Sequence, residues 1–378
     1  MNIAIVCYPT FGGSGVVATE LGIALSAKGH EVHFITYHQP VRLEALQHHS
    51  IHFHEVNIPE YPLFKYQPYE LALSSRLLDV VKNAHIDVLH VHYAIPHAYA
   101  AYMAKKMLMD EGIQIPIVTT LHGTDITLVG SHPFYRPAVT FSINHSDRVT
   151  AVSQSLKQDT IRLFDIKINI EVVPNFIDIE KIDSVGKPCE RTLLAEKEEK
   201  ILTHISNFRP LKRIMDVISI FERLNSEISC RLMMVGEGPE KIKALDYVEK
   251  KGLSDKILFL GNSNEIDKIL CYSDLFLLPS EKESFGLSAL EAMAHGVPVI
   301  SSNAGGLPEV NKEGYSGYLS NIGDIDEMVS KAKNLLLNEN LHKQFKQQAK
   351  KQASLFSLER IIGKYETIYS DAVASTKF

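Results

Sequence analysis

One stretch in the second half of the chain constrains the fold most. Asp274–Pro279 is a short, mostly apolar run that indicates a buried strand. After Gly286 the apolar residues recur at helical spacing, and Gly296 is a natural stop past the helix end. Val297–Ile300 then starts another strand. The order of strand, glycine loop, helix and strand is typical of an open parallel sheet, where a ligand binds beyond the carboxyl ends of the strands.

The loop and the start of this helix have the chemistry of a nucleotide-sugar site. The first amides of a helix have no partner inside it and carry the positive end of its dipole, which suits a phosphate. Glu283 lies just before the helix and Glu291 within it, and a carboxylate accepts hydrogen bonds from sugar hydroxyls. The alternative is that both are ordinary solvated glutamates. The amides expected to face the phosphate are those near Phe285 to Ser288.

The same alternation of strands and helices extends over the rest of the chain. It predicts an α/β fold of parallel sheets covered on both faces by helices. The chain is expected to be helical from residue 324 onward. The boundary between two domains is expected between about residues 175 and 200, and the last part of this segment, 196–200, is a cluster of charged residues. The predicted strands are 3–6, 31–36, 51–56, 87–92, 115–120, 147–153, 170–175, 201–206, 230–235, 256–260, 274–279 and 297–300.

A second glycine loop follows the first predicted strand, at residues 12–15. It lacks the G-x-G-x-x-G spacing, and Thr36 and Tyr37 replace the acidic residue that would hold a ribose, so a dinucleotide cofactor is disfavoured. Gly13 and Ser14 are candidates for contact with a phosphate or sugar. The alternative interpretation is a tight turn with no ligand.

Composition excludes several classes of function. The chain has 378 residues and a formal net charge of −6, which argues against nucleic acid as a partner because a basic footprint would be expected. No apolar run has the length of a membrane helix and the first residues lack a signal-peptide pattern, so we expect a cytoplasmic protein without a membrane partner. No C-x-x-C pair indicates zinc, and the histidine pairs His52/His54 and His90/His92 lack further ligands. The oligomeric state stays open, a homo-oligomer included.

Glu283 and Glu291, with seven residues between them, match a family signature. With it the chain resembles the retaining glycosyltransferases of GT-B architecture, which have two Rossmann-like domains facing a central cleft. The resemblance covers nearly the whole chain, and within the family it is similar to the enzymes of bacillithiol biosynthesis that join N-acetylglucosamine to L-malate. The closer match rests on residues 7–9 with 12–15, 53–56, 92–98, 119–127, 206–209 and 280–287.

The resemblance implies domains, substrates and site residues. Residues 1–175, joined by a C-terminal helix at 358–378, would form the acceptor domain, and residues 176–357 the donor domain. The donor would be UDP-N-acetylglucosamine and the acceptor L-malate, without a metal or cofactor. The implied catalytic residues are His122, Glu283, Arg209 and Lys212. Donor contacts would come from Gly13, Ser14, Asn207, Gly238, Ser284, Phe285, Gly286, Leu287 and Glu291, and acceptor contacts from Ser14, Lys65, Tyr93, Thr119 and Arg136.

Three alternatives stay open. Relatives often carry the diphosphate-binding arginine at the position of Asn207, so either Asn207 or Arg209 is the contact, and the role of Asp125 beside His122 is undefined. A transferase of the same architecture with a lipid or polysaccharide acceptor is the second possibility. The third is a nucleotide-sugar binding protein without turnover, which would tolerate loss of His122 and Glu283.

Overall fold

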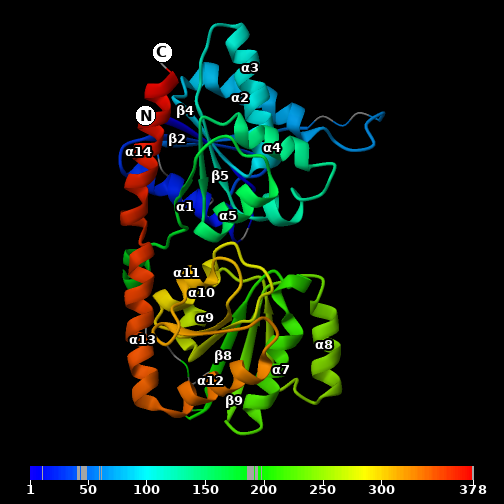
Figure 1. Cartoon of the computed structure of the whole chain (residues 1–378), viewed down its shortest axis with the longest axis vertical. Helices are drawn as coiled ribbons and strands as arrows, with labels where there is room; N and C mark the ends of the chain where they lie inside the picture. The colour runs from blue at the N-terminus through cyan, green and yellow to red at the C-terminus, as the bar shows by residue number, and fades with distance from the viewer. Residues whose placement is uncertain are drawn as a thin grey trace. The chain divides into compact units, whose positions relative to one another are not determined.

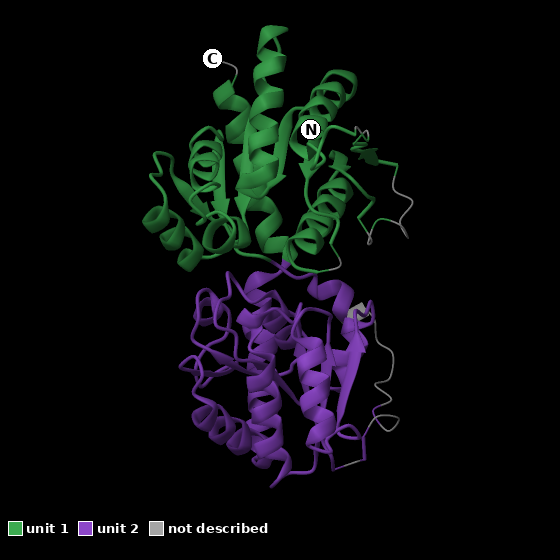
Figure 2. Ribbon diagram, turned by 90° about the vertical axis from the view of Figure 1, so that its right-hand side faces the viewer, with its two compact units in different colours: residues 1–175, 358–378 green, residues 176–357 purple. Residues whose placement is uncertain are grey.

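The structure, a computed structural model, describes residues 1–376 except 11, 41–42, 44–48, 59, 61, 185–190, 192–194 and 197. The chain divides into two compact units (Figure 2). Unit 1 is residues 1–175 together with 358–378, and unit 2 is residues 176–357. Each unit has its own parallel sheet, as predicted for an α/β fold.

Within the described residues, the sheet of unit 1 has seven parallel strands in the order β3-β2-β1-β4-β5-β6-β7. Strands β1, β4 and β5 are rich in Ile, Val and Leu and are almost wholly buried, because helices cover both faces of the sheet (Figure 1). The strands are β1 (Asn2–Val6), β2 (Glu31–Thr36), β3 (Ile51–Glu55), β4 (Val88–His92), β5 (Ile117–Leu121), β6 (Arg148–Ala151) and β7 (Ile170–Val172).

The helices of unit 1 bury apolar stripes against this sheet. Helices α2 and α3 pack on each other, and their buried side chains share a core with those of β1, β4 and β5. The last helix, α14, follows α13 of unit 2 in sequence but packs against α1, β4 and β5. The elements are α1 (Ser14–Ala27), α2 (Tyr69–Ala84), α3 (Tyr99–Asp110), α4 (Arg136–Asn144), α5 (Gln154–Leu163) and α14 (Leu358–Thr376), with π-helical turns η2 (Ala94–Ala98) and η3 (Thr124–Leu128).

The six described strands of unit 2 repeat the order of β3-β2-β1-β4-β5-β6 in unit 1. They are all parallel, in the order β10-β9-β8-β11-β12-β13. Every predicted strand is present, and β13 is an additional one that the sequence analysis missed. The strands are β8 (Lys200–Ile205), β9 (Cys230–Val235), β10 (Ile257–Gly261), β11 (Leu275–Leu278), β12 (Val299–Ser302) and β13 (Gly317–Ser320).

Helices surround the second sheet (Figure 1). Helix α7 buries six apolar residues in the unit's largest described core, together with side chains from β8, β9, β11 and α12. The chain is helical from residue 325, as expected. The elements are α6 (Ile179–Ser184), α7 (Ile214–Asn225), α8 (Lys241–Lys250), α9 (Ile266–Tyr272), α10 (Leu287–Ala294), α11 (Leu307–Val310), α12 (Ile325–Leu337) and α13 (Glu339–Ala353), with 3-10 turns η5 (Pro210–Lys212) and η6 (Ser354–Phe356).

The strand order reverses at one place in each sheet. In unit 1 the reversal lies between β1 and β4, and in unit 2 between β8 and β11. In open parallel sheets, ligands bind beyond the carboxyl ends of the strands at this point. The loops after β1, β4, β8 and β11 are therefore the places to look for a site, and most of the predicted site residues lie in them or in the loop after β5.

Candidate functional site

The loop after β11 ends at the amino terminus of α10. Gly286 precedes the helix with φ = 99°, a left-handed conformation that glycine adopts without strain. The first backbone hydrogen bond of the helix runs from the Leu290 amide to the Gly286 carbonyl at 3.1 Å, so the amides of residues 287–289 have no partner in the preceding turn. Phe285 is buried and packs edge-on against Phe356 at 5.5 Å between ring centroids. The predicted helix start is present at the reversal of the sheet, and its role in binding an anion stays a prediction.

Glu283 is held from three sides in the same loop. Its carboxylate forms an ion pair with the Lys212 ammonium, and the two side chains are 11% and 16% exposed. The Ser280 hydroxyl donates to the same carboxylate oxygen at 3.1 Å. The Gly306 amide donates to the Glu283 carbonyl at 2.9 Å, and the neighbouring Gly305 lies so close that a Cβ there would be 1.9 Å from that oxygen. The sequence placed Glu283 and Lys212 in one site but did not predict that they pair.

The loop after β8 carries Asn207 and Arg209, both exposed, around the buried Phe208. His204 fastens the start of this loop, because its Nδ1 donates to the Leu277 carbonyl at 2.8 Å and its Nε2 then accepts from the Ser206 hydroxyl at 2.8 Å. Burial lowers the pKa of His204 to about 4, so this histidine is neutral. Both exposed polar side chains therefore lie on a loop that is anchored to β11.

Two further candidates for donor binding in unit 2 are Gly238 and Glu291. Gly238 belongs to the loop after β9, and a Cβ there would be 2.1 Å from the Asn207 carbonyl oxygen, so the two loops touch through backbone. Glu291 lies within α10 and is partly buried, and its carbonyl accepts from the His295 ring at 2.9 Å. The predicted donor residues of unit 2 thus include two carboxylates, one lysine and one arginine, and they lie in the loops and the helix start around one sheet reversal.

In unit 1 the structure brings Ser14 and Tyr93 together. The Ser14 hydroxyl and the Tyr93 phenol share a hydrogen bond of 2.5 Å, although they lie after different strands, β1 and β4. Gly13, which precedes α1 with φ = 64°, is exposed beside them. The Tyr93 ring also contacts the His122 ring, with centroids 5.1 Å apart. Three predicted residues from three loops therefore meet at the reversal of the first sheet.

His122 continues into a row of histidines. Its Nε2 shares a hydrogen bond of 2.8 Å with Nδ1 of the buried His92, and the two rings stack. His92 in turn lies against His90, which bonds to Thr120 at 2.8 Å and to the Tyr369 phenol of α14 at 2.7 Å. Burial is the main cause that lowers the pKa of His90 and of His122 to about 3, and it holds the pKa of His92 well below its usual value. These rings are neutral at physiological pH.

Asp125, the second residue of η3, contacts the backbone at His122. Its Oδ2 accepts from the Ala94 amide at 2.8 Å, and its Oδ1 accepts from the Gly123 amide at 3.0 Å and the His122 amide at 3.3 Å. The side chain is buried, and burial raises the pKa of Asp125 to about 6 although the backbone amides lower it. One carboxylate therefore joins the loop after β4 to the loop after β5.

The contacts described for the remaining acceptor candidates, Thr119, Lys65 and Arg136, do not join them to the cluster of Ser14, Tyr93 and His122. Thr119 is wholly buried inside β5, and its hydroxyl bonds to the Ser146 hydroxyl at 2.7 Å. Lys65 is exposed, with its ammonium 5.5 Å from the centre of the Tyr66 ring. Arg136 is exposed at the first position of α4. Its backbone amide donates a hydrogen bond to the His132 carbonyl at 2.9 Å, so only its side chain is a candidate for ligand contact.

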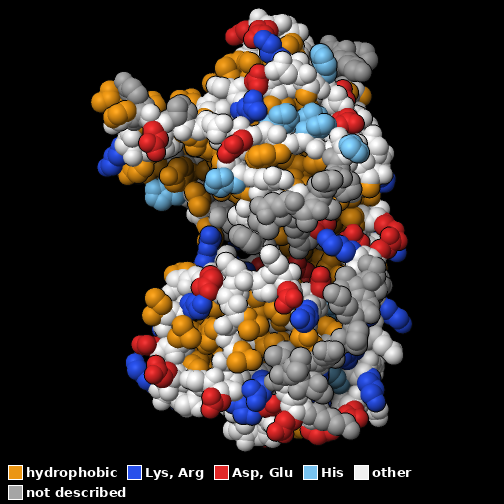
Figure 3. Space-filling view, turned by 180° about the vertical axis from the view of Figure 1, so that it is seen from behind, with side chains coloured by type: hydrophobic (Ala, Val, Ile, Leu, Met, Phe, Trp, Pro, Cys, Tyr) orange, Lys and Arg blue, Asp and Glu red, His pale blue; other side chains and the backbone are white. Residues whose placement is uncertain are grey.

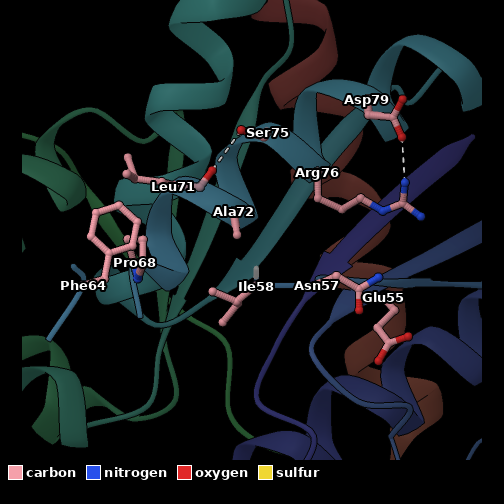
Figure 4. Close-up of a pocket in the computed structure, with 10 residues that line it drawn as sticks. All are labelled: Glu55, Asn57, Ile58, Phe64, Pro68, Leu71, Ala72, Ser75, Arg76 and Asp79. Carbon is pink, nitrogen blue, oxygen red and sulfur yellow. Dashed lines mark hydrogen bonds and ion pairs between the residues drawn. The ribbon is translucent and has the colours of Figure 1, made fainter. Parts of the chain in front are cut away.

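A groove of about 650 Å³ lies elsewhere in unit 1, between the segment after β3 and the exposed side of α2 (Figure 4). Apolar side chains and an Arg76–Asp79 ion pair of 2.7 Å line it. None of the predicted site residues is among the lining residues, although Lys65 is adjacent in sequence to Phe64, which is. The groove is therefore distinct from the cluster around Tyr93 and His122.

The described surface and side chains carry three further observations. Among the described residues, no group of three or more His, Cys, Asp or Glu side chains could hold a metal ion. The face drawn in Figure 3 shows basic side chains interspersed with acidic ones. No described helix is long and apolar enough to cross a membrane.

Sequence reasoning missed the residues that hold the predicted ones in place. The row formed by His90, His92 and His122 was suggested only by strand alternation, which puts His90 and His92 on one face. The link from His92 to His122 joins neighbouring strands and leaves no local pattern. The same is true of the contact between Gly305 and Glu283, although the Gly305-Gly306 pair marks a place where backbones approach closely.

Both halves of the chain match glycosyltransferase families. The family described as glycosyl transferases group 1 matches residues 190–352, and glycosyltransferase family 4 matches residues 11–181. A Bacillus anthracis protein named N-acetyl-alpha-D-glucosaminyl L-malate synthase is 46% identical over 383 residues, which cover 100% of this chain and 98% of that protein.

Solved structures share the fold. A glycosyltransferase from Rickettsia africae superposes with a TM-score of 0.79 at 20% identity, covering 98% of both chains. The Anabaena protein HepE, crystallised in complex with UDP and glucose, gives a TM-score of 0.78 at 20% identity, covering 98% of this chain and 99% of its own. At this identity the two structures support the architecture alone, which is that of the GT-B glycosyltransferases.

Proposed function

Since the chain belongs to the glycosyltransferases with two Rossmann-like domains, we propose that it transfers N-acetylglucosamine from UDP-N-acetylglucosamine to the hydroxyl of L-malate, with retention at the sugar carbon. The observation that carries the choice of substrates is the 46% identity, over the full length, to a protein named for that reaction. The reaction would be the first step of bacillithiol biosynthesis, in the cytoplasm.

The donor is proposed to bind unit 2. The diphosphate would accept hydrogen bonds from the amides at Gly286 and Leu287 and would face the cations Lys212 and Arg209. Glu291 would hold the ribose diol and Glu283 a hydroxyl of the transferred sugar. The recorded Lys212–Glu283 pair supports this arrangement, because the lysine can neutralise the carboxylate that would otherwise repel a nearby diphosphate. Asn207, Gly238, Ser284 and Phe285 complete the proposed donor contacts, with Gly13 and Ser14 from unit 1.

The acceptor is proposed to bind unit 1. L-Malate has two carboxylates and a hydroxyl, so its site needs cations and neutral hydrogen-bonding groups. Tyr93 and Ser14 supply hydroxyls that are already aligned by their 2.5 Å bond. Lys65 and Arg136 are the proposed cations, and both are exposed. Thr119 is retained from the family resemblance, although its hydroxyl bonds to Ser146.

The proposed reaction uses no protein nucleophile and no metal. The bond between the sugar carbon and the UDP oxygen breaks, and the malate oxygen forms the new bond on the same face of the sugar. The malate proton passes to the departing diphosphate oxygen. Lys212, Arg209 and the helix amides stabilise the charge that develops there, and such groups contribute most when they are in place before the reaction. His122, as a neutral imidazole, would hydrogen-bond the transferred sugar.

The test is release of UDP from UDP-N-acetylglucosamine with and without L-malate. We expect UDP release to depend on malate and the product to be the α-glycoside. Release that is equal without malate would contradict the proposed acceptor. Release that appears only with a lipid or polysaccharide acceptor would favour the alternative transferase, and tight UDP binding without any turnover would favour a binding protein.

A further inference from the structure

Asp125 has no role in the proposed chemistry, yet its carboxylate makes three recorded hydrogen bonds to backbone amides. Oδ2 accepts from Ala94, in the loop after β4, while Oδ1 accepts from His122 and Gly123, in the loop after β5. The side chain is 3% exposed, so water cannot easily replace these bonds. A buried amide that loses its partner is costly, and the two loops are therefore firmly tied to each other.

We propose that Asp125 is a positioning residue, which sets the relative placement of Tyr93 and His122 through the amides next to them. This inference rests on the proposed function for its link to turnover. Asp125 touches no substrate in this account. It acts because Tyr93 immediately precedes Ala94 in the chain, and because His122 donates its own amide to the carboxylate.

The backbone on both sides of the carboxylate explains why such a tie is needed. Tyr93 has φ = 85°, a left-handed value that a residue with a side chain adopts only at a cost in energy. Gly123 has φ = 109° in the other loop. Strained conformations persist when surrounding contacts over-determine them, and the Ala94 amide bond directly follows the strained Tyr93.

The tie also places the aromatic contacts of the cluster. The rings of Tyr93 and His122 are 5.1 Å apart, and the Tyr93 phenol bonds to Ser14 at 2.5 Å. If the two loops separate, the Tyr93 phenol and the His122 ring move apart as well. A displacement of about 1 Å at a site of this kind can lower the rate about 100-fold.

The experiment compares Asp125→Asn with Asp147→Asn. Asp147 is the control: it lies in the same unit and also accepts a backbone amide, that of Ile117 at 2.7 Å, but at the opposite end of β5, where it also pairs with Lys105 at 2.7 Å. Asp125→Asn replaces one acceptor oxygen by an amide nitrogen that faces a backbone N–H. We expect it to lower kcat about 10- to 100-fold and to leave the Kd for UDP within about twofold. Asp147→Asn should change kcat less than about threefold. Its Tm should fall by about as much as the Tm of Asp125→Asn.

A second measurement does not depend on turnover. Nitrogen-15 NMR of the histidine rings should show shifted His122 and His92 signals in Asp125→Asn and unshifted ones in Asp147→Asn, because only Asp125 holds the His122 backbone. If the wild-type protein shows no malate-dependent release, the proposed function fails, and the NMR comparison still decides the role of Asp125. Unshifted His122 signals, or equal kcat losses in the two variants, would overturn the proposal. If Asp125→Asn does not fold, Asp125→Ser, which keeps one oxygen acceptor, takes its place in both measurements.

Discussion

Replacing Gly305 by alanine tests whether the backbone of Glu283 must stay where it is. Gly305 lies in the loop after β12, with φ = 54°, and faces the Glu283 carbonyl. An alanine Cβ would be 1.9 Å from that oxygen, whereas ordinary contact begins at 3.4 Å, so the two groups must separate by about 1.5 Å. The obstacle is backbone on both sides, which cannot rotate away as a flexible side chain would.

The size of the effect follows from this separation. A left-handed φ costs a residue with a Cβ about 1–2 kcal/mol, and this part of the loss affects stability alone. The forced shift acts on Glu283 and hence on its pairing with Lys212. Because about 1 Å of misplacement can cost about 100-fold in rate, we expect Gly305→Ala to lower kcat/KM for sugar transfer about 100-fold or more.

Gly314→Ala supplies the matched control. Gly314 also has a left-handed φ, 68°, in unit 2, but a Cβ there would meet nothing within 4 Å. Both variants should lose stability, measured by urea unfolding, and Gly314→Ala should keep its activity per folded molecule. UDP affinity, measured by calorimetry, should stay within a few-fold in both. Nearly equal kcat/KM values for the two variants would refute the reasoning that the Gly305 contact fixes Glu283.

Three further predictions follow from the site and its histidines. Glu291→Ala should weaken UDP binding about tenfold in calorimetry while Glu283→Ala lowers mainly kcat, and the reverse pattern would exchange their proposed roles. Arg136→Ala should raise the KM for malate without changing UDP affinity; a change on the UDP side alone would move Arg136 to the donor. Lowering the pH from 7 to 5.5 should destabilise unit 1 more than unit 2, because histidines in the unfolded chain bind protons below about pH 6.5 while His90, His97 and His122, with pKa values of about 3 to 4, stay neutral when folded. Each contributes stability that is present above pH 6.5 and lost as the pH falls, about 1.2 kcal/mol apiece over this range, against less than about 1 kcal/mol regained by the raised pKa of Asp125. Urea unfolding followed by pulsed hydrogen exchange of peptides from each unit measures this, and equal losses in the two units would contradict it.

The architecture was accessible from sequence because its signals are local. Buried parallel strands such as β4 and β11 are short apolar runs, and glycines such as Gly286 mark the turns that follow them. The strand β13 escaped because Gly317–Ser320 has four residues and begins at a glycine, which weakens a strand pattern. The π-helical turns η2 and η3 escaped because such turns are rare and have no distinctive composition.

The site could be predicted only in part from the sequence, because only some of its residues lie in a local pattern. A side chain that meets a ligand sits on a loop with a recognisable pattern, as Glu283 and His122 do. A side chain that holds another one in place can come from any part of the chain. His90 and Tyr369 are 279 residues apart in sequence, yet they share a hydrogen bond of 2.7 Å. The local sequence of α14 does not predict that the Tyr369 phenol will contact β4.

The two units place side chains of different chemistry at the same point of their sheets. Both place their candidate residues where the strand order reverses, but unit 2 presents a charged set, Lys212 with Glu283, beside free helix amides. Unit 1 presents neutral rings and hydroxyls, Tyr93, Ser14 and His122, because burial keeps its histidines uncharged. We propose that the diphosphate binds unit 2, because Lys212 and Arg209 lie there in the loop after β8 and α10 begins at the same sheet reversal. In the proposed acceptor site, the Tyr93 and Ser14 hydroxyls would orient the malate hydroxyl, and the cations Lys65 and Arg136 would bind its carboxylates. The proposed division of donor and acceptor between the units therefore rests on which side chains lie at each sheet reversal, in a chain whose two sheets share the order of six strands.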